Sequence, residues 1–425
     1  MVTDVFQEFE WRGLVHQVTD PELSKILRDQ NLVVYAGFDP TAPSLTAAHL
    51  IQIIRLRWLQ MAGHRPIAVA GGGTGLIGDP SGRDMERELL SQEQVAGNVD
   101  SIRGQLSAIL DFEPGDTQAL LVNNADWLTK LNLTDFLRDV GKHFSVNSMI
   151  SKEAVKTRLT EREQGISFTE FSYLLLQAFD FLHLFDTQGC RMQIGGSDQW
   201  GNITAGVELI RRVRAETAYG LTCPLIEYEG RKMSKSEGTA VWLSPDMTSP
   251  YEFYQYWINT PDSQVSQFLR FFTFLEKQRI QELEGELAKD PAQREAQKVL
   301  AWEVTALVHG EAEAQRVRNA SETLFDEEIA ALDEPSLLEI LAEAPTSDVP
   351  RSRLVDGVSL VDLLTETGLT PSKSAARTDI SSGGAYVNNR READPEHRVR
   401  AGDLLHDKYL VLRRGRKTYH LVRVV

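Results

Sequence analysis

The sequence predicts an α/β fold with a parallel sheet, followed by a helical segment and a small α+β domain at the C-terminus. Short apolar runs alternate with longer segments whose apolar residues recur every three or four positions. The 425 residues, 42% hydrophobic and 25% charged, suffice for two or three domains. Charge is divided unevenly: residues 351–425 carry 14 Lys and Arg against 9 Asp and Glu, and residues 1–350 carry 31 against 52.

The first predicted strand covers residues 31–36, where β-branched and apolar residues precede Gly37 and two prolines. A helix follows and ends at Gly63. Unpaired backbone N–H groups and the helix dipole make such a helix N-terminus a candidate anion site, and Thr46 and His49 lie there. The predicted buried face of this helix consists of Leu50, Ile53, Ile54, Trp58 and Met61.

Residues 71–80, GGGTGLIGDP, satisfy the G-x-G-x-x-G spacing of dinucleotide-binding loops after the apolar run 67–70. That motif requires a long helix, whose N-terminus holds the pyrophosphate. Pro80 and Gly82 disfavour such a helix. We therefore interpret the match as coincidental and do not expect a nicotinamide cofactor.

Residues 171–181, FSYLLLQAFDF, predict a helix with three polar residues in an apolar run. Tyr173, Gln177 and Asp180 are spaced by four and three positions, so they project from one face. Core packing is the usual explanation for such an apolar helix. A buried aspartate is costly unless it is paired, however, so Asp180 is expected to meet a hydrogen-bond donor.

Residues 193–202, QIGGSDQWGN, predict a strand-to-helix turn. Gly195 and Gly196 would let the backbone approach a ligand closely. Asp198 could bind that ligand or could simply cap the following helix, and the two roles are compatible.

The segment 232–236, KMSKS, places the ammonium groups of Lys232 and Lys235 three positions apart, between Gly230 and Gly238. Flexible lysines can follow phosphate oxygens as they move, while Met233 anchors the loop. The alternative interpretation is an ordinary solvated charged loop.

We predict four regions: 1–245, a catalytic domain; 246–345, a helical domain; 346–356, a linker; and 357–425, a small α+β domain. The basic C-terminal residues predict contacts with RNA phosphates rather than with bases. A basic tail that serves only solubility is the alternative. The candidates are Lys373 and Arg377 on a short helix, and Arg413, Arg414, Arg416 and Lys417 in a turn between two strands.

The N-terminus has no apolar run, so we expect a cytoplasmic protein without a signal peptide or membrane span. Its two cysteines, Cys190 and Cys223, are too few for a disulfide framework or a thiolate metal site. No histidine pair has zinc-ligand spacing, and we expect no protein-bound metal.

These motifs together resemble the class I aminoacyl-tRNA synthetases and, more narrowly, the bacterial tyrosyl-tRNA synthetases. The resemblance rests on YAGFDPTAPSLTAAHL (35–50), GLIGDPSGR (75–83), FSYLLLQAFDF (171–181), QIGGSDQWGN (193–202) and KMSKS (232–236). It implies a Rossmann-like parallel-sheet catalytic domain, a helical domain that holds the anticodon stem, and an S4-like RNA-binding domain. It also implies a homodimer that binds tRNA(Tyr), tyrosine and ATP.

The resemblance implies that tyrosine is first activated by ATP, with Mg²⁺ carried by the phosphates, and is then transferred to tRNA. Its phenol would meet Tyr35 and Asp180, and its amino group Asp79, Tyr173 and Gln177. Gln193 completes the tyrosine site. The implied ATP-binding residues are Gly37, Asp39, His49, Gly196, Asp198, Gln199, Met233, Ser234 and Lys235. The implied catalytic residues are Thr41, Thr46, His49, Lys232 and Lys235.

One signature departs from the family pattern. Where the family has His-x-Gly-His, this chain has Thr46, Ala47, Ala48 and His49. Thr46 can donate a hydrogen bond but carries no positive charge, which predicts slow activation. Two alternatives follow: a weakened paralogue that binds tRNA or senses tyrosine, or an enzyme that adenylates a tyrosine analogue.

Overall fold

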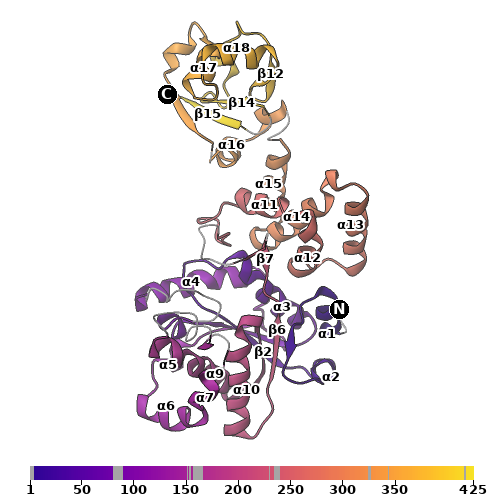
Figure 1. The fold of residues 1–425 in the computed structure, drawn as a ribbon, viewed down its shortest axis with the longest axis vertical. Coiled ribbons are helices and arrows are strands. Elements are labelled where there is room, and N and C mark those ends of the chain that lie inside the picture. Colours follow the sequence, from indigo (N-terminus) through magenta and orange to yellow (C-terminus); the bar gives the residue numbers. More distant parts are fainter. Residues whose placement is uncertain are drawn as a thin grey trace. The chain divides into compact units, whose positions relative to one another are not determined.

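The computed structural model describes residues 4–79, 90–150, 152, 155–156, 166–228, 230–233, 240–323, 327–342, 344–415 and 418–425. The chain divides into two compact units (Figure 1). The N-terminal unit consists of Met1–Thr248 and Tyr256–His309, and the C-terminal unit consists of Ser249–Gln255 and Gly310–Val425. The predicted helical domain, 246–345, thus contributes segments to both units. The predicted domain boundaries stay a prediction.

A six-stranded sheet forms the centre of the N-terminal unit, in the order β1-β6-β5-β2-β3-β4. Strands β2 to β6 pair in parallel along this order, and the edge strand β1 is antiparallel to β6. This confirms the predicted parallel-sheet core. The strands are β1 (Gln17–Val18), β2 (Val33–Phe38), β3 (Arg65–Ala70), β4 (Leu120–Asn123), β5 (Cys190–Gly196) and β6 (Tyr219–Cys223).

Helices connect these strands and cover the sheet (Figure 1). The helix after β2 is buried nearly all round, with nine of its twelve residues inside, rather than on one face as predicted. Met61, predicted to be buried, is 40% exposed at its last position. The helices are α1 (Val5–Arg12), α2 (Leu23–Asp29), α3 (Leu50–Met61), α4 (Gln92–Ser107), α5 (Ala125–Leu128), α6 (Leu133–Asp139), α7 (Val146–Ile150), α9 (Phe168–Gln188) and α10 (Trp200–Arg214).

The order of the strands creates a crevice beside β2. From β2 the chain continues to β3 on one side, whereas the other neighbour, β5, comes much later in the sequence. The connections at the carboxyl ends of these strands therefore diverge, which is where open α/β sheets bind ligands. The glycines at the end of β5 and the turn after β2 both lie at this edge.

Arg12, at the end of α1, is 1% exposed and joins distant parts of the N-terminal unit. Its guanidinium pairs with Glu8 at 2.7 Å and donates to the backbone carbonyls of Arg270, Thr273 and Leu275. The Trp58 ring lies 4.5 Å from it. A buried charge is tolerated here because a carboxylate and several acceptors satisfy it.

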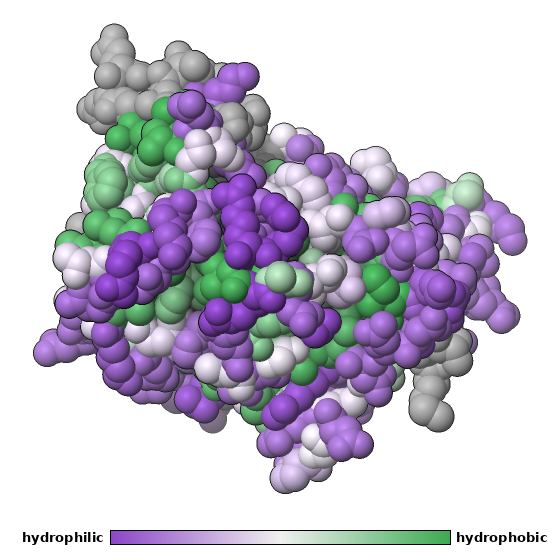
Figure 2. Space-filling model, turned by 90° about the horizontal axis from the view of Figure 1, so that it is seen from below, coloured by the Kyte–Doolittle hydropathy of each residue, from purple (hydrophilic) through white to green (hydrophobic). Residues whose placement is uncertain are grey.

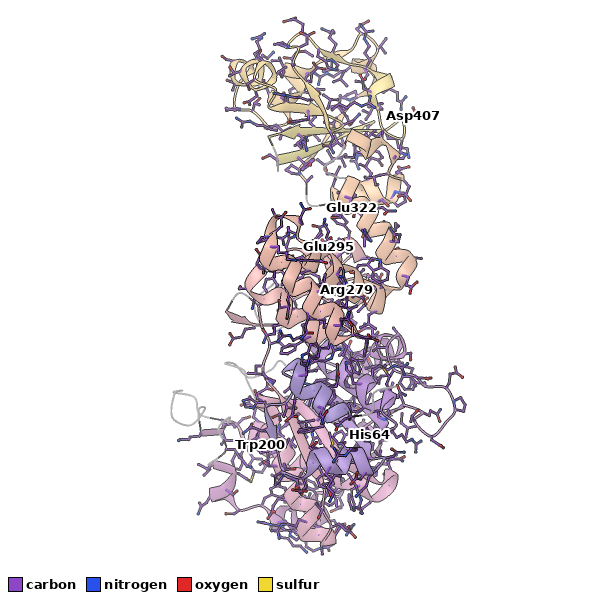
Figure 3. The ribbon with its side chains drawn as sticks, turned by 90° about the vertical axis from the view of Figure 1, so that its right-hand side faces the viewer. His64, Trp200, Arg279, Glu295, Glu322 and Asp407 are labelled. Atoms are coloured by element: carbon purple, nitrogen blue, oxygen red, sulfur yellow. The ribbon has the colours of Figure 1, made fainter. Side chains whose placement is uncertain are left out.

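Further helices belong to the N-terminal unit. They are α12 (Asp262–Phe272), α13 (Lys277–Lys289), α14 (Glu295–His309) and the end of α11 (Pro250–Ile258). Figure 3 labels Arg279 on α13 and Glu295 on α14, whose side chains are 39% and 47% exposed. The chain between β6 and α11 contains the short strands β7 (Glu227–Tyr228) and β8 (Arg231–Lys232), which pair with each other.

The C-terminal unit is built on a five-stranded sheet in the order β12-β11-β14-β15-β9. The predicted short helix with Lys373 and Arg377 is confirmed as α18, and the two predicted strands are confirmed as β14 and β15. Apolar residues of α17, α18 and the sheet form one core. Its elements are α15 (Glu311–Thr323), α16 (Glu334–Ile340), β9 (Thr346–Val349), β10 (Val358–Ser359), α17 (Leu360–Glu366), α18 (Lys373–Ser381), β11 (Ala385–Val387), β12 (Arg390–Glu392), β13 (Arg398–Val399), β14 (Tyr409–Arg414) and β15 (Thr418–Val424).

Two expectations about this unit need correction. Part of the predicted linker 346–356 is strand β9, which pairs in parallel with β15. Arg413 and Arg414, predicted to lie in a turn, are the last residues of β14. Arg413 is 8% exposed because it packs on the ring of Tyr386 at 3.9 Å, and Arg414 pairs with Asp379 at 2.8 Å. Arg416 and Lys417 lie outside the described residues.

Within the described part of the chain, no helix is long and apolar enough to cross a membrane.

Candidate functional site

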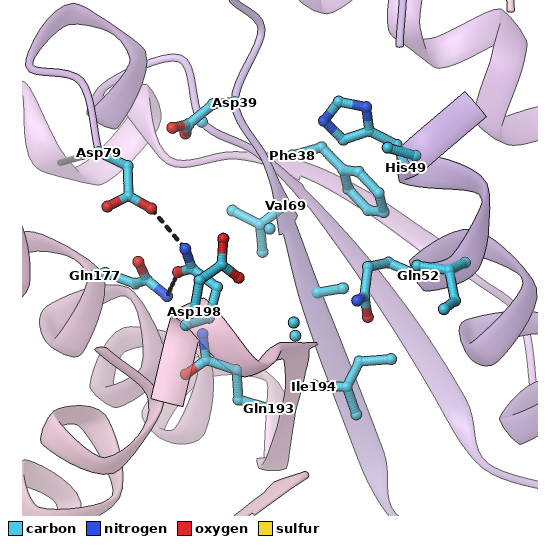
Figure 4. A pocket seen from close by; sticks show the side chains of 18 of the residues that line it. Phe38, Asp39, His49, Gln52, Val69, Asp79, Gln177, Gln193, Ile194 and Asp198 are labelled. Atoms are coloured by element: carbon cyan, nitrogen blue, oxygen red, sulfur yellow. Dashed lines mark hydrogen bonds between the residues drawn. The ribbon is translucent and has the colours of Figure 1, made fainter. Parts of the chain in front are cut away.

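A cavity of about 280 Å³ opens at the carboxyl ends of β2 and β5 (Figure 4). Its wall combines the turn after β2, the N-terminus of α3, one face of α9 and the β5–α10 turn. The structure thus brings together motifs separated by more than a hundred residues. The predicted site residues that line it are Tyr35, Gly37, Asp39, Thr41, Thr46, His49, Asp79, Tyr173, Gln177, Asp180, Gln193, Gly196, Asp198, Gln199 and Met233.

One end of the cavity is buried and polar. Asp180, 3% exposed, accepts hydrogen bonds from Asn124 Nδ2 at 2.9 Å and from Trp127 Nε1 at 2.7 Å. Burial raises the pKa of Asp180 to about 7, although these two donors favour its ionised form. Asn124 is itself fixed, because its side-chain oxygen accepts from the backbone N–H of Gly73 at 2.7 Å.

Tyr35 and Gln193 add unsatisfied polar atoms to this part of the cavity. The Tyr35 hydroxyl and the Gln193 side-chain oxygen are buried and have no hydrogen-bond partner in the described part of the chain. Burial, and the neighbouring Asp180 carboxyl, raise the pKa of Tyr35 well above its usual value, so the hydroxyl stays protonated. Because such atoms are costly to leave unpaired, this end suits a ligand with a hydrogen-bonding group.

The middle of the cavity carries two networks with carboxylates. The Tyr173 hydroxyl donates to Asp39 at 3.2 Å. The Asp79 carboxylate accepts from Gln199 Nε2 at 2.7 Å, and Gln199 in turn accepts from Gln177 Nε2 at 3.2 Å (Figure 4). Two carboxylates line this space, an arrangement that suits a positively charged group such as an ammonium.

The N-terminus of α3 forms the other end, with the short turn Ala47–His49 in front of it. The Thr46 hydroxyl lies 2.8 Å from His49 Nδ1, and Thr46 is 3% exposed. Gly37 faces open space, since a Cβ atom built there would meet no atom within 4 Å. A ligand can therefore approach the β2 backbone at this point.

The glycines at the end of β5 are required mainly by the protein itself. A Cβ atom on Gly195 would lie 3.1 Å from Gln199 Cβ, and one on Gly196 would lie 2.7 Å from Asp198 Oδ1. Both side chains line the cavity. Glycine at these positions therefore lets Gln199 and Asp198 fold back against the strand.

The lysine-rich segment lies mostly outside the described residues, which include no side chain of Lys232 and nothing of Ser234 and Lys235. Its flanks are held in place. The Met233 N–H donates to the Ile226 carbonyl at 2.9 Å, and Met233 lines the cavity. On the far side, Val241 accepts from the Ala47 N–H at 2.8 Å, which ties the chain that leaves the segment to the start of α3.

Sequence reasoning missed several residues of the site. Asn124 and Trp127 hold Asp180, Thr74 donates to Asp39 at 3.1 Å, and Gln52 lines the cavity beside His49. A signal existed for Asn124, because it lies two residues after the apolar run 119–122 and so at the carboxyl end of a strand. Trp127 gave no comparable signal.

Comparisons with known proteins agree over nearly the whole chain. The family described as tRNA synthetases class I (W and Y) matches residues 27–326, and the tyrosine–tRNA ligase SYY-like C-terminal domain matches residues 340–422. The tyrosine–tRNA ligase of Roseiflexus castenholzii is 50% identical over 426 residues, covering 100% of both chains. That of Geobacillus stearothermophilus is 50% identical over 424 residues, covering 99% of both.

A solved structure agrees as well. The C-terminally truncated mitochondrial tyrosyl-tRNA synthetase of Aspergillus nidulans is 33% identical and has a TM-score of 0.69. The match covers 76% of this chain and 94% of that one.

Proposed function

This chain belongs to the tyrosine–tRNA ligases among the class I tRNA synthetases, and on that premise we propose that it activates tyrosine with ATP and transfers it to tRNA(Tyr). The observation that carries the substrate assignment is the buried pair of Tyr35 and Asp180. The Tyr35 hydroxyl has no partner among the described residues, and Asp180 retains lone pairs beside its bonds to Asn124 and Trp127. A phenol would donate to Asp180 and accept from Tyr35.

We assign the remaining roles from the same geometry. The ammonium group of tyrosine would meet Asp79, Tyr173 and Gln177. This leaves its carboxylate directed toward the nucleotide, which would occupy the end formed by Gly37, His49 and the β5–α10 turn. Asp39, Asp198 and Gln199 line the path between these two ends.

The first step needs no enzyme nucleophile, since the tyrosine carboxylate is already ionised. It attacks the α-phosphate of ATP, the bond to the β-phosphate oxygen breaks, and pyrophosphate leaves. The protein contributes alignment and stabilisation of the developing charge. We propose that Thr41, Thr46 and His49 act there, together with Lys232 and Lys235. In the second step a hydroxyl of the terminal tRNA ribose attacks the adenylate and releases AMP.

Magnesium would enter with the phosphates. Among the described residues, no group of three His, Cys, Asp or Glu side chains could hold a metal ion. We propose that the cation is bound mainly by phosphate oxygens and water. It would neutralise charge on the triphosphate.

We propose that the C-terminal unit binds tRNA through an S4-like surface. Lys373 and Arg377 on α18 are exposed, which suits phosphate contacts, although Lys373 also pairs with Asp362 at 2.7 Å. Arg413 is a weaker candidate, because its guanidinium is packed between Tyr386 and Tyr419. The tRNA role of Arg414, Arg416 and Lys417 remains a prediction. Since tRNA charging accompanies translation, we expect a cytoplasmic location.

We also propose a homodimer formed through α6, α7 and the start of α9. These helices expose large apolar side chains, with Phe168 78% and Leu133 70% exposed. Figure 2 shows hydrophobic residues between hydrophilic ones on the face that it draws. Other exposed apolar side chains of these helices are Leu137, Val146 and Ile150. A partner that covers them would remove this apolar surface from water.

The test is ATP–pyrophosphate exchange with purified protein. We expect exchange that depends on tyrosine and is far weaker with phenylalanine, which leaves Tyr35 and Asp180 unpaired. Charging of tRNA(Tyr) is then measured separately. Absence of exchange would refute the activation step, and exchange without charging would indicate that a different acceptor takes the tyrosyl group.

A further inference from the structure

The cavity has an unfavourable charge for a nucleotide. Its described lining includes four aspartates and no lysine or arginine. ATP brings several negative charges into this space, and carboxylates repel them. Positive charge must therefore come from groups that do not themselves line the described wall. The four aspartates are Asp39, Asp79, Asp180 and Asp198.

Arg55 lies directly behind this wall. On α3 it comes three residues after Gln52, which in turn comes three residues after His49, the residue that precedes the helix, so each is a neighbour of the next on the helix surface. Its guanidinium donates to Gln52 Oε1 at 2.9 Å, to the Gly195 carbonyl at 3.1 Å and to the Leu221 carbonyl at 3.3 Å. Gln52 and Gly195 both line the cavity. One layer of atoms thus separates the guanidinium from the ligand space.

No carboxylate among the described residues pairs with Arg55. Arg55 is 0% exposed, its hydrogen bonds to the Gln52 amide and to two backbone carbonyls use neutral acceptors, and the Cys223 side chain lies beside its guanidinium. Its Nε has no partner in the described part of the chain, and burial lowers the pKa of the guanidinium from its usual value, although the neighbouring Cys223 side chain opposes this shift. Even so, arginine stays charged in proteins. Burying a charge without a carboxylate partner destabilises the fold, which points to a function of this charge in the adjacent cavity.

Arg12 provides the internal comparison. It is also buried, at 1% exposure, but it pairs with the Glu8 carboxylate at 2.7 Å. The residues it bonds do not belong to the cavity wall. Arg12 therefore has the features of a structural cation, whereas Arg55 has neutral partners and lies against the site.

We propose that Arg55 is a positioning residue of the nucleotide end, where its charge, which no carboxylate of the described residues pairs with, and its hydrogen bonds to Gln52 and Gly195 favour an anionic ligand. This rests on the proposed ATP site. The family has a histidine at the position of Thr46, and the positive charge of the Arg55 guanidinium compensates in part for the absence of that histidine. It acts through the wall, without touching the nucleotide.

The test compares a charged and an uncharged nucleoside ligand. Binding of ATP and of adenosine is measured by calorimetry with the full-length protein, for the wild type and for Arg55→Met, Arg55→Gln and Arg55→Lys. We expect the uncharged variants to weaken ATP binding by about tenfold or more, while adenosine binding changes less than threefold. Arg55→Lys keeps the charge and should remain within about threefold of the wild type for both ligands.

Arg12→Met is the matched control for loss of a buried guanidinium. It should lower the melting temperature without changing the ratio of ATP to adenosine affinity. The proposal would be overturned if Arg55→Met weakened the binding of ATP and of adenosine equally. It would also be overturned if a folded uncharged variant bound ATP as tightly as the wild type. If both uncharged variants fail to fold, the outcome rests on Arg55→Lys, and a tenfold loss of ATP binding there would refute a role of the charge.

Failure of the proposed function gives a different result. A wild-type protein that binds ATP but shows no tyrosine-dependent exchange would refute tyrosine activation and leave the Arg55 comparison intact. In an active enzyme, Arg55→Met should raise KM for ATP about tenfold and change KM for tyrosine less than twofold.

Discussion

Thr46 and His49 form a closed pair at the start of α3: the Thr46 hydroxyl lies 2.8 Å from His49 Nδ1, and the Thr46 backbone N–H donates to the same nitrogen at 3.1 Å. Because Nδ1 accepts from this N–H, neutral His49 carries its proton on Nε2. Thr46 therefore orients the histidine that remains in the signature. It does so without adding the charge of a second histidine.

Replacing Thr46 with valine should slow activation modestly. The change removes the hydroxyl but keeps the backbone contact to His49, and a neutral hydrogen bond contributes about 0.5 to 1.5 kcal/mol. We expect kcat of exchange to fall about three- to tenfold, with KM for tyrosine unchanged. Thr46→Ser, which keeps the hydroxyl, is the control and should stay near the wild-type rate. Equal rates for Val and Ser would show that the hydroxyl has no role.

Restoring the family signature should accelerate activation. The double variant Thr46→His with Ala48→Gly adds a charged donor at the helix N-terminus and removes a methyl group from the cavity wall. A hydrogen bond to a charged group contributes about 1.5 to 3 kcal/mol, so we expect a gain of about ten- to hundredfold in single-turnover adenylate formation. The single variants separate the two effects. No gain over a slow wild type would favour the weakened paralogue.

Tyrosine binding should depend on pH through Asp180. Its pKa is raised to about 7, mainly by burial, so the carboxyl is largely protonated at pH 6 and ionised at pH 8. Only the ionised form accepts a charge-assisted hydrogen bond from the phenol. We expect KM for tyrosine to fall about five- to tenfold from pH 6 to pH 8.

The controls for this pH dependence are Asp180→Asn and thermal unfolding. Asp180→Asn should give a flat profile and poor discrimination against phenylalanine. A carboxyl whose folded pKa is raised stabilises the fold below its unfolded pKa and loses that contribution as pH rises through about 7. Because tyrosine binds more tightly when Asp180 is ionised, bound tyrosine should raise the melting temperature more at pH 8 than at pH 6. A pH-independent KM would contradict the role given to Asp180.

Charge on the exposed apolar surface should prevent dimer formation. Phe168→Asp places a carboxylate at a side chain that is 78% exposed in the single chain, and burying that charge in an interface is costly. We expect a monomer of 47.7 kDa by light scattering, against about twice that mass for the wild type. Val355→Asp, at an 80% exposed valine of the C-terminal unit, is the control and should remain dimeric.

Charge reversal on α18 should impair tRNA charging alone. Arg377→Glu would replace a phosphate contact by repulsion and should raise KM for tRNA severalfold. It should slow no step of tyrosine activation. Exchange without tRNA should be unchanged. Arg353→Glu, at an arginine that pairs with Glu366 at 2.8 Å, is the control and should have a smaller effect. Similar losses in both variants would argue against a specific surface on α18.

Much of the site could be predicted because its residues lie at the ends of elements that the sequence marks clearly. The strand before Gly37, the polar face of α9 and the Gly195–Gly196 turn each have a local pattern. Parallel strands bring their carboxyl ends to one edge, so these local patterns converge in one cavity.

The rest depends on tertiary contacts that no local pattern encodes. Trp127 bonds Asp180 only because α5 packs near α9 in space. Arg413 looked like a turn residue, yet β14 extends through it and turns its side chain toward two tyrosines. Arg12 and Arg55 are charged residues that composition places on the surface, and the structure buries both.

The Arg12 contacts also constrain how the polypeptide is made. This side chain bonds carbonyl groups 258 to 263 positions later, so the first helix finds its native acceptors only after almost two thirds of the protein has left the ribosome. Until then, the Arg12 guanidinium and the apolar residues of α1 lack the contacts that they make in the folded protein. The N-terminal unit therefore completes its folding late in synthesis, and α1 is among the last of its elements to reach the native position.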